Sequence, residues 1–126
     1  MSIPFPHPLY AKHVLGPGFA SAREHLWPWM LAANEAHALM LTERGIIPGT
    51  DVAALLDAQA QVEAEGRETF VYDPRVEDLF FLVERRLIEL AGPIAGGNLQ
   101  IARSRNDLAA TMARLLIRER LLATET

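Results

Sequence analysis

The sequence predicts an all-α fold, and three observations support that prediction. Four segments have apolar residues that recur every three or four positions, as on one face of a helix, whereas no segment alternates as a half-buried strand does. Glycine and proline separate these segments. With 126 residues, of which half are hydrophobic and 22% are charged, the chain is expected to fold as one domain or as part of one.

Residues 1–20 are predicted to form an extended arm, because they hold four of the eight prolines. The first helix is expected to begin at Ser21, since Ser21 and Glu24 have the spacing of a capping box. Pro28 lies about two turns further on, so the helix either kinks there or begins only at Trp27. Gly45, which follows Arg44, is expected to end this helix.

The second and third helices have their own start and stop signals. "IIPGTD" predicts a turn, after which Thr50 caps a helix that runs to about Glu65 and stops at Gly66. The third helix is expected to begin at Asp73 as its N-cap, with proline in the first helical position. It ends before "GP" at residues 92–93, and its buried stripe is predicted to contain Val76, Leu79, Phe80, Val83, Leu87 and Leu90.

The fourth helix is predicted to follow "RSRND" and to continue to the end of the chain. Its apolar positions are Leu108, Met112, Leu115, Leu116 and Leu122. No glycine, proline or polar tail follows this stripe. We therefore expect that the chain is truncated from a longer protein.

Composition argues against several classes of function. The formal net charge of −4 gives nucleic acid no electrostatic attraction. The chain has no cysteine and its four histidines lack the i, i+4 spacing of a helical metal site, so we expect no metal ion and no cofactor. There is no signal-peptide pattern, and no apolar stretch approaches the length of roughly 20 residues that is needed to span a bilayer. We expect a cytoplasmic protein without a membrane partner.

The segment "RSRND" concentrates hydrogen-bonding groups between a glycine pair and the fourth helix. Ser104 or Asn106 is expected to cap that helix, which leaves amide groups at the positive end of the helix dipole. Together with Arg103 and Arg105, these amides predict a site for a carboxylate or a phosphate, because the planar guanidinium matches such groups with two parallel bonds.

A plainer interpretation of the same segment stays open. In it, residues 104–107 are only the start of a helix, with Asp107 as a favourably placed acid. The two arginines are then solvated, or they pair with Asp78 or Glu84.

A longer stretch around this segment resembles a known family. "GGNLQIARSRNDLAAT", preceded by "VEDLFFLVERRLIELAGPIAGG", is similar to the first signature region of the argininosuccinate lyase branch of the fumarase/aspartase superfamily. "ANEAHALMLTERGII" also resembles that family's Ser-x-Ala-His…Gly-Ile segment. The resemblance covers residues 26–118, and it implies an N-terminal helical domain over residues 21–102 with the start of a central helical bundle at 103–126.

The resemblance implies a cytoplasmic homotetrameric lyase of arginine biosynthesis that breaks a C–N bond by β-elimination and releases fumarate. Its substrate would be a small dicarboxylate or an N-succinyl amino acid. The family's serine, second arginine and asparagine contact the substrate, and they correspond to Ser104, Arg105 and Asn106. Arg103 and Asp107 are expected to support them. Fixed donors aimed at the substrate carboxylate next to the carbon that loses its proton would stabilise the negative charge that grows on that carboxylate during elimination.

The resemblance also implies what the chain lacks. The family takes its base and acid from a Thr-His pair and a Gly-Ser-Ser loop, and neither occurs in the sequence. No catalytic residue is therefore assigned, and the chain alone is expected to be inactive. In the alignment with the family, Arg23 lies near the position of the aspartate that holds the amino-acid end of the substrate. Further departures from the family pattern occur at Phe80, Gln100, Ile101, Ala102 and Leu108. They predict a different N-substituted succinyl substrate or lost activity.

Two other functions stay open. The first is a non-catalytic helical module that keeps the lyase scaffold and associates with itself through Leu115, Leu116 and Leu122, since an uncovered apolar stripe needs a partner. The second is a domain that only binds small carboxylates.

Overall fold

The computed structural model describes residues 5–125, so residues 1–4 of the predicted arm and Thr126 lie outside the described residues. The helical elements are α1 (Pro8–Tyr10), the π-helical turn η1 (Ala11–Leu15), α2 (Gly16–His25), α3 (Trp27–Glu43), α4 (Gly49–Glu65), the 3-10 helix η2 (Arg67–Thr69), α5 (Leu79–Ala91), α6 (Pro93–Asn98) and α7 (Arg105–Thr124). Residues 5–125 contain no strand. The predicted all-α class is confirmed.

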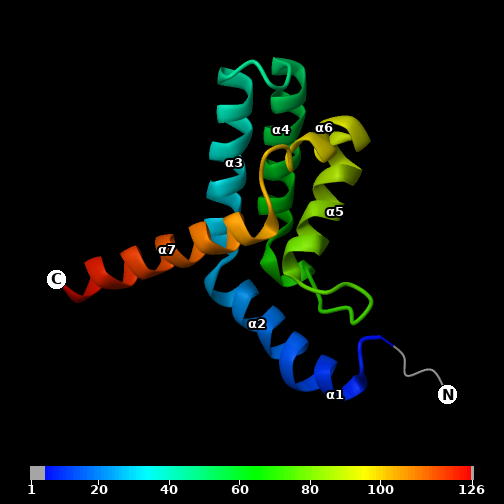
Figure 1. Cartoon of the computed structure of the whole chain (residues 1–126), viewed down its shortest axis with the longest axis vertical. Helices are drawn as coiled ribbons and strands as arrows, with labels where there is room; N and C mark the ends of the chain where they lie inside the picture. The colour runs from blue at the N-terminus through cyan, green and yellow to red at the C-terminus, as the bar shows by residue number, and fades with distance from the viewer. Residues whose placement is uncertain (1–4, 126) are drawn as a thin grey trace.

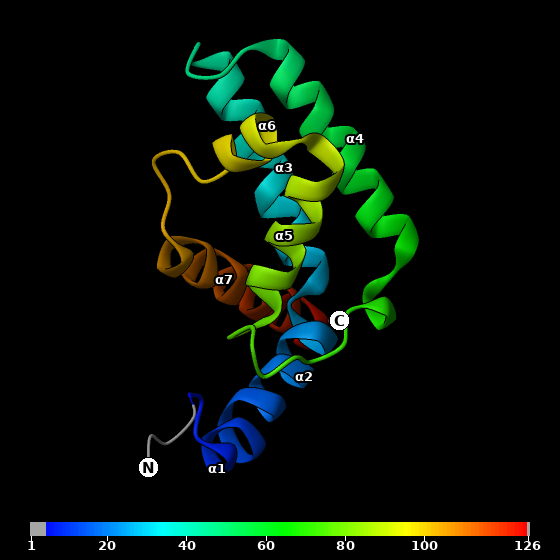
Figure 2. The ribbon, with the colours of Figure 1, turned by 90° about the vertical axis from the view of Figure 1, so that its right-hand side faces the viewer.

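The body of the molecule consists of α3, α4 and α5, which pack beside one another (Figure 1). The short helix α6 lies against both α4 and α5. Helix α7 contacts α3 near its own start and then projects away from the body toward the C-terminus, while α1 and α2 extend from the lower end of the body (Figures 1 and 2).

The N-terminal segment is helical from residue 8 onward, so the extended arm predicted for residues 1–20 is wrong over this part. Pro8 and Pro17 lie in the first turns of α1 and α2. A proline is tolerated there because the N–H that it lacks has no partner within the helix. Ser21 lies inside α2, so the capping box predicted at Ser21 is also wrong. Of the two expectations at Pro28, the structure has a helix that begins at Trp27.

Two predicted helix starts differ from the structure. Helix α4 begins at Gly49 with Pro48 as its N-cap, and not at Thr50. Helix α5 begins at Leu79, because Asp78 rather than Asp73 is the N-cap. The backbone around Asp73 closes a turn, in which the Val76 amide donates to the Asp73 carbonyl at 2.9 Å.

The predicted stops at Gly66 and Gly92 are confirmed, and both residues have positive φ angles, of 80° and 90°. Helix α6 is not predicted by the sequence, because Gly96 and Gly97 break helices more often than they form them. Gly96 has a packing role: a Cβ atom at this position would lie 2.6 Å from the Cα of Ile88 in α5. The missing side chain lets α6 approach α5 closely.

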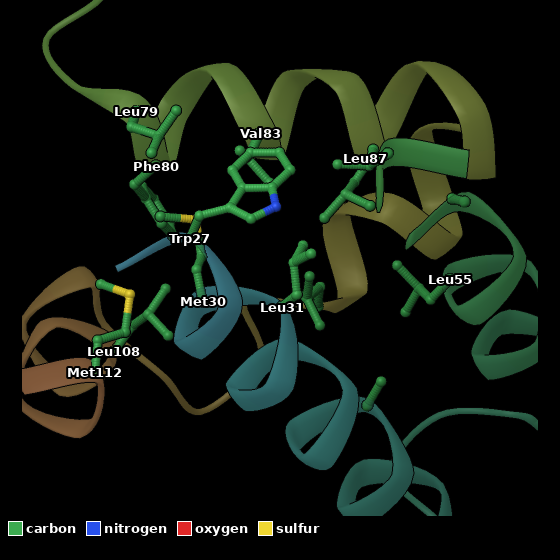
Figure 3. Close-up of a cluster of buried hydrophobic side chains, with 14 of the residues drawn as sticks. Trp27, Met30, Leu31, Leu55, Leu79, Phe80, Val83, Leu87, Leu108 and Met112 are labelled. Carbon is green, nitrogen blue, oxygen red and sulfur yellow. The ribbon is translucent and has the colours of Figure 1, made fainter. Parts of the chain in front are cut away.

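The core lies between α3, α4, α5 and the first half of α7 (Figure 3). Its labelled members are Trp27, Met30, Leu31, Leu55, Leu79, Phe80, Val83, Leu87, Leu108 and Met112. The second half of α7 contributes none of them: Ile117, Leu121 and Leu122 are 57%, 61% and 54% exposed.

Candidate functional site

The start of α7 forms a complete capping box. The Ser104 hydroxyl oxygen accepts from the Asp107 amide at 3.3 Å, and the Asp107 carboxylate accepts from the Ser104 amide at 2.8 Å. The Ser104 hydroxyl also donates to that carboxylate, at 2.9 Å. These bonds lower the pKa of Asp107, the backbone bond most of all. The box fixes where α7 begins, and it is Ser104 rather than Asn106 that caps the helix.

Arg105 is bound to the start of α5. Its Nη1 atom lies 3.0 Å from the Asp78 carboxylate and 3.2 Å from that of Glu77, and its guanidinium lies 5.1 Å from the centre of the Phe81 ring. Hydrogen bonding to Glu77 raises the pKa of Arg105, and the charge of Asp78 adds to this. Asp78 also accepts from the Phe81 amide as the N-cap of α5. One carboxylate thus joins the starts of α5 and α7.

Arg103 is held less tightly than Arg105. Its Nε and Nη2 atoms each lie 3.4 Å from the Gln100 side-chain oxygen, and its Nη1 atom is buried without a hydrogen-bond partner. Burial lowers the pKa of Arg103, while the charges of Glu84 and Asp107 act against this shift. The guanidinium is therefore partly desolvated and weakly bonded.

The side chains of Ser104, Arg105 and Asn106 do not have equivalent surroundings. Asn106 is exposed in the first turn of α7, whereas Arg105 is half-buried and paired. Asp78, with which Arg105 pairs, is one of the two partners that the plainer interpretation named. Neither Glu77 nor Phe81 was predicted at this site. "VED" could have pointed to Glu77 once Asp78, rather than Asp73, was recognised as the N-cap of α5.

A hollow of about 450 Å³ lies between α3 and the start of α7. It is lined by Ala33, Ala36, His37, Met40, Ala102, Arg103, Asp107, Leu108 and Thr111. His37, on the α3 side, is half-buried, and its Nε2 atom lies 3.0 Å from the carbonyl oxygen of Ile101. Burial lowers the pKa of His37, the hydrogen bond to Ile101 acts against this shift, and the nearby charge of Arg103 adds to it.

The five departures from the family pattern fall into two groups. Phe80 and Leu108 belong to the buried core, with 9% and 1% of their surfaces exposed (Figure 3). Gln100, Ile101 and Ala102 form the loop that leads into α7, and Ala102 has a positive φ of 57°. The first group lies in the core, and only the second group lies in the loop beside the start of α7.

Arg23 is anchored away from the start of α7. It donates to the carbonyl oxygen of Phe70 at 3.0 Å and lies 3.7 Å from the Glu68 carboxylate. The structure thus ties Arg23 to the segment after α4.

No three His, Asp or Glu side chains in residues 5–125 are grouped so that they could hold a metal ion. Every helix in the same range is too short or too polar to cross a membrane.

The chain is similar to several argininosuccinate lyases. It is 36% identical over 106 residues to argininosuccinate lyase 1 of Shouchella clausii, which covers 84% of this chain and 21% of that protein. It is 33% identical over 118 residues to argininosuccinate lyase 2 of Agrobacterium fabrum, covering 93% and 23%. The argininosuccinate lyase of Methanothrix thermoacetophila is 46% identical over 87 residues, covering 69% and 17%.

No protein-family model and no solved structure matches the chain. The chain spans about a fifth of the length of the curated relatives that it matches. Together with the all-α fold and the intact "RSRND" segment at a helix start, these similarities relate the chain to a part of the argininosuccinate lyases.

Proposed function

We propose that this chain is the substrate-binding N-terminal part of an argininosuccinate-lyase-like carbon–nitrogen lyase. The complete enzyme cleaves an N-succinyl-type substrate by β-elimination, releases fumarate and acts as a cytoplasmic homotetramer in arginine biosynthesis. Residues 21–102 form its N-terminal domain, and residues 103–126 begin its central bundle. The observation that carries the proposal is the capped start of α7, where "RSRND" meets a 20-residue helix.

The first turn of α7 suits a carboxylate for physical reasons. Amide groups without a helical partner point out of the N-terminus, where the helix dipole favours negative charge. Asn106 adds an exposed neutral donor at this position, whereas the exposed Ser104 hydroxyl donates to Asp107 and has to leave that carboxylate in order to bind a substrate. Removing the proton next to a carboxylate increases the negative charge on that carboxylate, so donors already fixed in place stabilise the transition state more than the ground state.

Arg105 contributes mainly by holding these donors in place. Its guanidinium joins α7 to Asp78 and Glu77 and lies over Phe81. Three partners fix the side chain at a helix start, and a fixed charge needs little reorganisation when substrate binds. In this proposal Arg105 keeps its pair with Asp78 while part of its fork faces the substrate.

The chain does not supply the general base of this reaction. It contains neither the Thr-His pair nor the Gly-Ser-Ser loop that the family uses. Elimination requires a group that removes a proton from carbon and a group that protonates the leaving nitrogen. Both come from other parts of the proposed enzyme.

A graft tests the proposal. Residues 26–118 replace the aligned segment of argininosuccinate lyase 1 of Shouchella clausii, and ultraviolet absorbance follows fumarate formation from argininosuccinate. We expect an active graft, no fumarate from the 126-residue chain alone, and a loss of about 100-fold in kcat/KM for Asn106→Ala. Thr111→Ala is the matched control, because the Thr111 hydroxyl only donates to its own helix backbone. Fumarate formation by the isolated chain would contradict the proposal.

A second candidate function is favoured by the exposed part of α7. Ile117, Leu121 and Leu122 lie uncovered on a projecting helix, and exposed apolar surfaces of this kind mark association sites. In this alternative the chain is a non-catalytic module that self-associates. Sedimentation equilibrium would then show an oligomer that Leu121→Glu dissociates, and a monomeric wild-type chain would reject this function.

A further inference from the structure

His37 links the body of the molecule to the loop that leads into α7. It lies in α3, and its Nε2 atom is 3.0 Å from the carbonyl oxygen of Ile101, a residue 64 positions away in the chain. Helix α3 packs against both α4 and α7. A hydrogen bond from α3 therefore joins this loop to a helix of the molecule's body.

The loop needs such an anchor because its backbone is not regular. Ala102 has a φ of 57°, in the left-handed region that costs free energy for any residue with a side chain. The adjacent Arg103 has only weak bonds to Gln100. Two residues later Ser104 must be placed so that it caps α7. Without a hydrogen bond from outside the loop, the chain would lower its free energy if Ala102 left this conformation. The start of α7 would then lose its position.

The chemistry of His37 suits this task. The carbonyl oxygen of Ile101 can only accept, so the Nε2 atom carries the hydrogen. Burial lowers the pKa of His37, the hydrogen bond to Ile101 acts against this shift, and the positive charge of Arg103 adds to it, so that the pKa lies below its ordinary value. The ring is therefore neutral at pH 7 and has its hydrogen on Nε2. This tautomer holds the carbonyl without placing a second positive charge beside Arg103.

We propose that His37 is a positioning residue for the start of α7, and that its bond to Ile101 sets the direction in which the donors of residues 104–106 point. His37 lines the hollow between α3 and α7 but does not contact the substrate in this proposal. The functional part of the inference rests on the proposed function, whereas its structural part, the ordering of the loop, does not.

Three variants of the 126-residue chain test the structural part. His37→Phe keeps a ring of similar size and removes the donor, whereas His37→Gln replaces the donor by an amide N–H. His25→Phe is the matched control, since His25 is an exposed histidine at the end of α2. Amide hydrogen exchange is followed for Arg103, Asp107 and Leu108, whose amides donate within this segment.

We expect His37→Phe to accelerate exchange at these three amides by about ten-fold while α4 is unchanged. His37→Gln restores protection, and His25→Phe has no effect. We also expect the nitrogen spectrum of the wild-type ring to show hydrogen on Nε2 and none on Nδ1. Unchanged exchange in His37→Phe, equal acceleration in α4, or failure of His37→Gln to restore protection would each overturn the inference.

The lyase graft tests the functional part. There we expect His37→Phe to lower kcat/KM by about ten-fold, and His37→Gln to recover most of it. An unchanged kcat/KM in an active graft would overturn the positioning role. An inactive wild-type graft would instead count against the proposed function, and the exchange experiment would then still decide whether His37 orders the loop.

Discussion

Arg103 and Arg105 are two positions apart and have the same chemistry, but the fold places them in different environments. Arg105 has two carboxylates and an aromatic ring as partners, whereas Arg103 is partly desolvated with one weakly bonded neighbour. The sequence predicted a cluster of donors and a cap at Ser104 or Asn106, of which the structure has Ser104. It could not predict which arginine is paired, because that depends on Asp78, which is 27 positions away in the chain.

A glycine at position 102 is expected to stabilise the protein. Ala102 has a positive φ, and relief of that strain outweighs the larger entropy that glycine loses on folding. We expect Ala102→Gly to raise the free energy of unfolding by about 1 kcal/mol in urea titrations. Ala110→Gly, at an exposed position inside α7, should lower it by about as much. A destabilised Ala102→Gly variant would contradict the strain assigned to the loop.

The stability of the chain is expected to fall on mild acidification. Because burial lowers the pKa of His37 from 6.5, the unfolded chain takes up a proton at a higher pH than the folded chain does. The stability that the neutral ring contributes is fully present above pH 6.5. It is lost as the pH falls from 6.5 through the lower pKa of the folded chain, so the free energy of unfolding decreases. We expect a smaller decrease between pH 7.5 and 5.5 in His37→Gln, measured by urea unfolding. An equal pH dependence in both proteins would show that His37 does not titrate in this way.

At the scale of the elements, helix ends were predicted better than helix starts. Gly66 and Gly92 end helices for a local reason, the freedom of glycine at positive φ. The start of α5 was ambiguous because Asp73 and Asp78 are both suitable caps, and only the turn after Asp73 decides between them. Helix α6 was missed because its stability depends on contact with α5, which its own residues do not reveal.

The two glycines of α6 are expected to respond differently to the same substitution. Gly96→Ala would place a Cβ atom 2.6 Å from the Ile88 backbone, whereas Gly97 has no atom within 4 Å of that position. We expect Gly96→Ala to lower the free energy of unfolding by about 1–3 kcal/mol. Gly97→Ala should leave it unchanged or raise it by up to about 1 kcal/mol. Equal effects in chemical denaturation would show that α6 does not pack against α5 as described.

At the scale of the whole molecule, the fold class could be predicted because helical periodicity and the lack of strand alternation are properties of the sequence itself. The arrangement of the helices could not. Phe80 and Leu108 come from α5 and α7, and only the folded chain shows that both lie in one core rather than at the site. The exposure of Ile117 and Leu121 also depends on the direction in which α7 leaves the body.

Removal of the last turns of α7 is expected to leave the fold intact. Residues 117–125 are all exposed, so their deletion takes little apolar surface out of the core. We expect a chain ending at Leu116 to keep its helical circular dichroism, and its Tm to stay within about 3 °C of that of the full chain. A much lower Tm would mean that this part of α7 is covered in solution, as the self-association alternative requires.

Asp78 caps one helix and binds the first residue of another, and this shared use makes the two helix starts thermodynamically interdependent. In a double-mutant cycle, substitutions at Asp78 and Arg105 should therefore be non-additive. Any anion that draws Arg105 toward itself changes the environment of the carboxylate that holds the first turn of α5. Occupancy at one helix would then be detectable as fraying at the other.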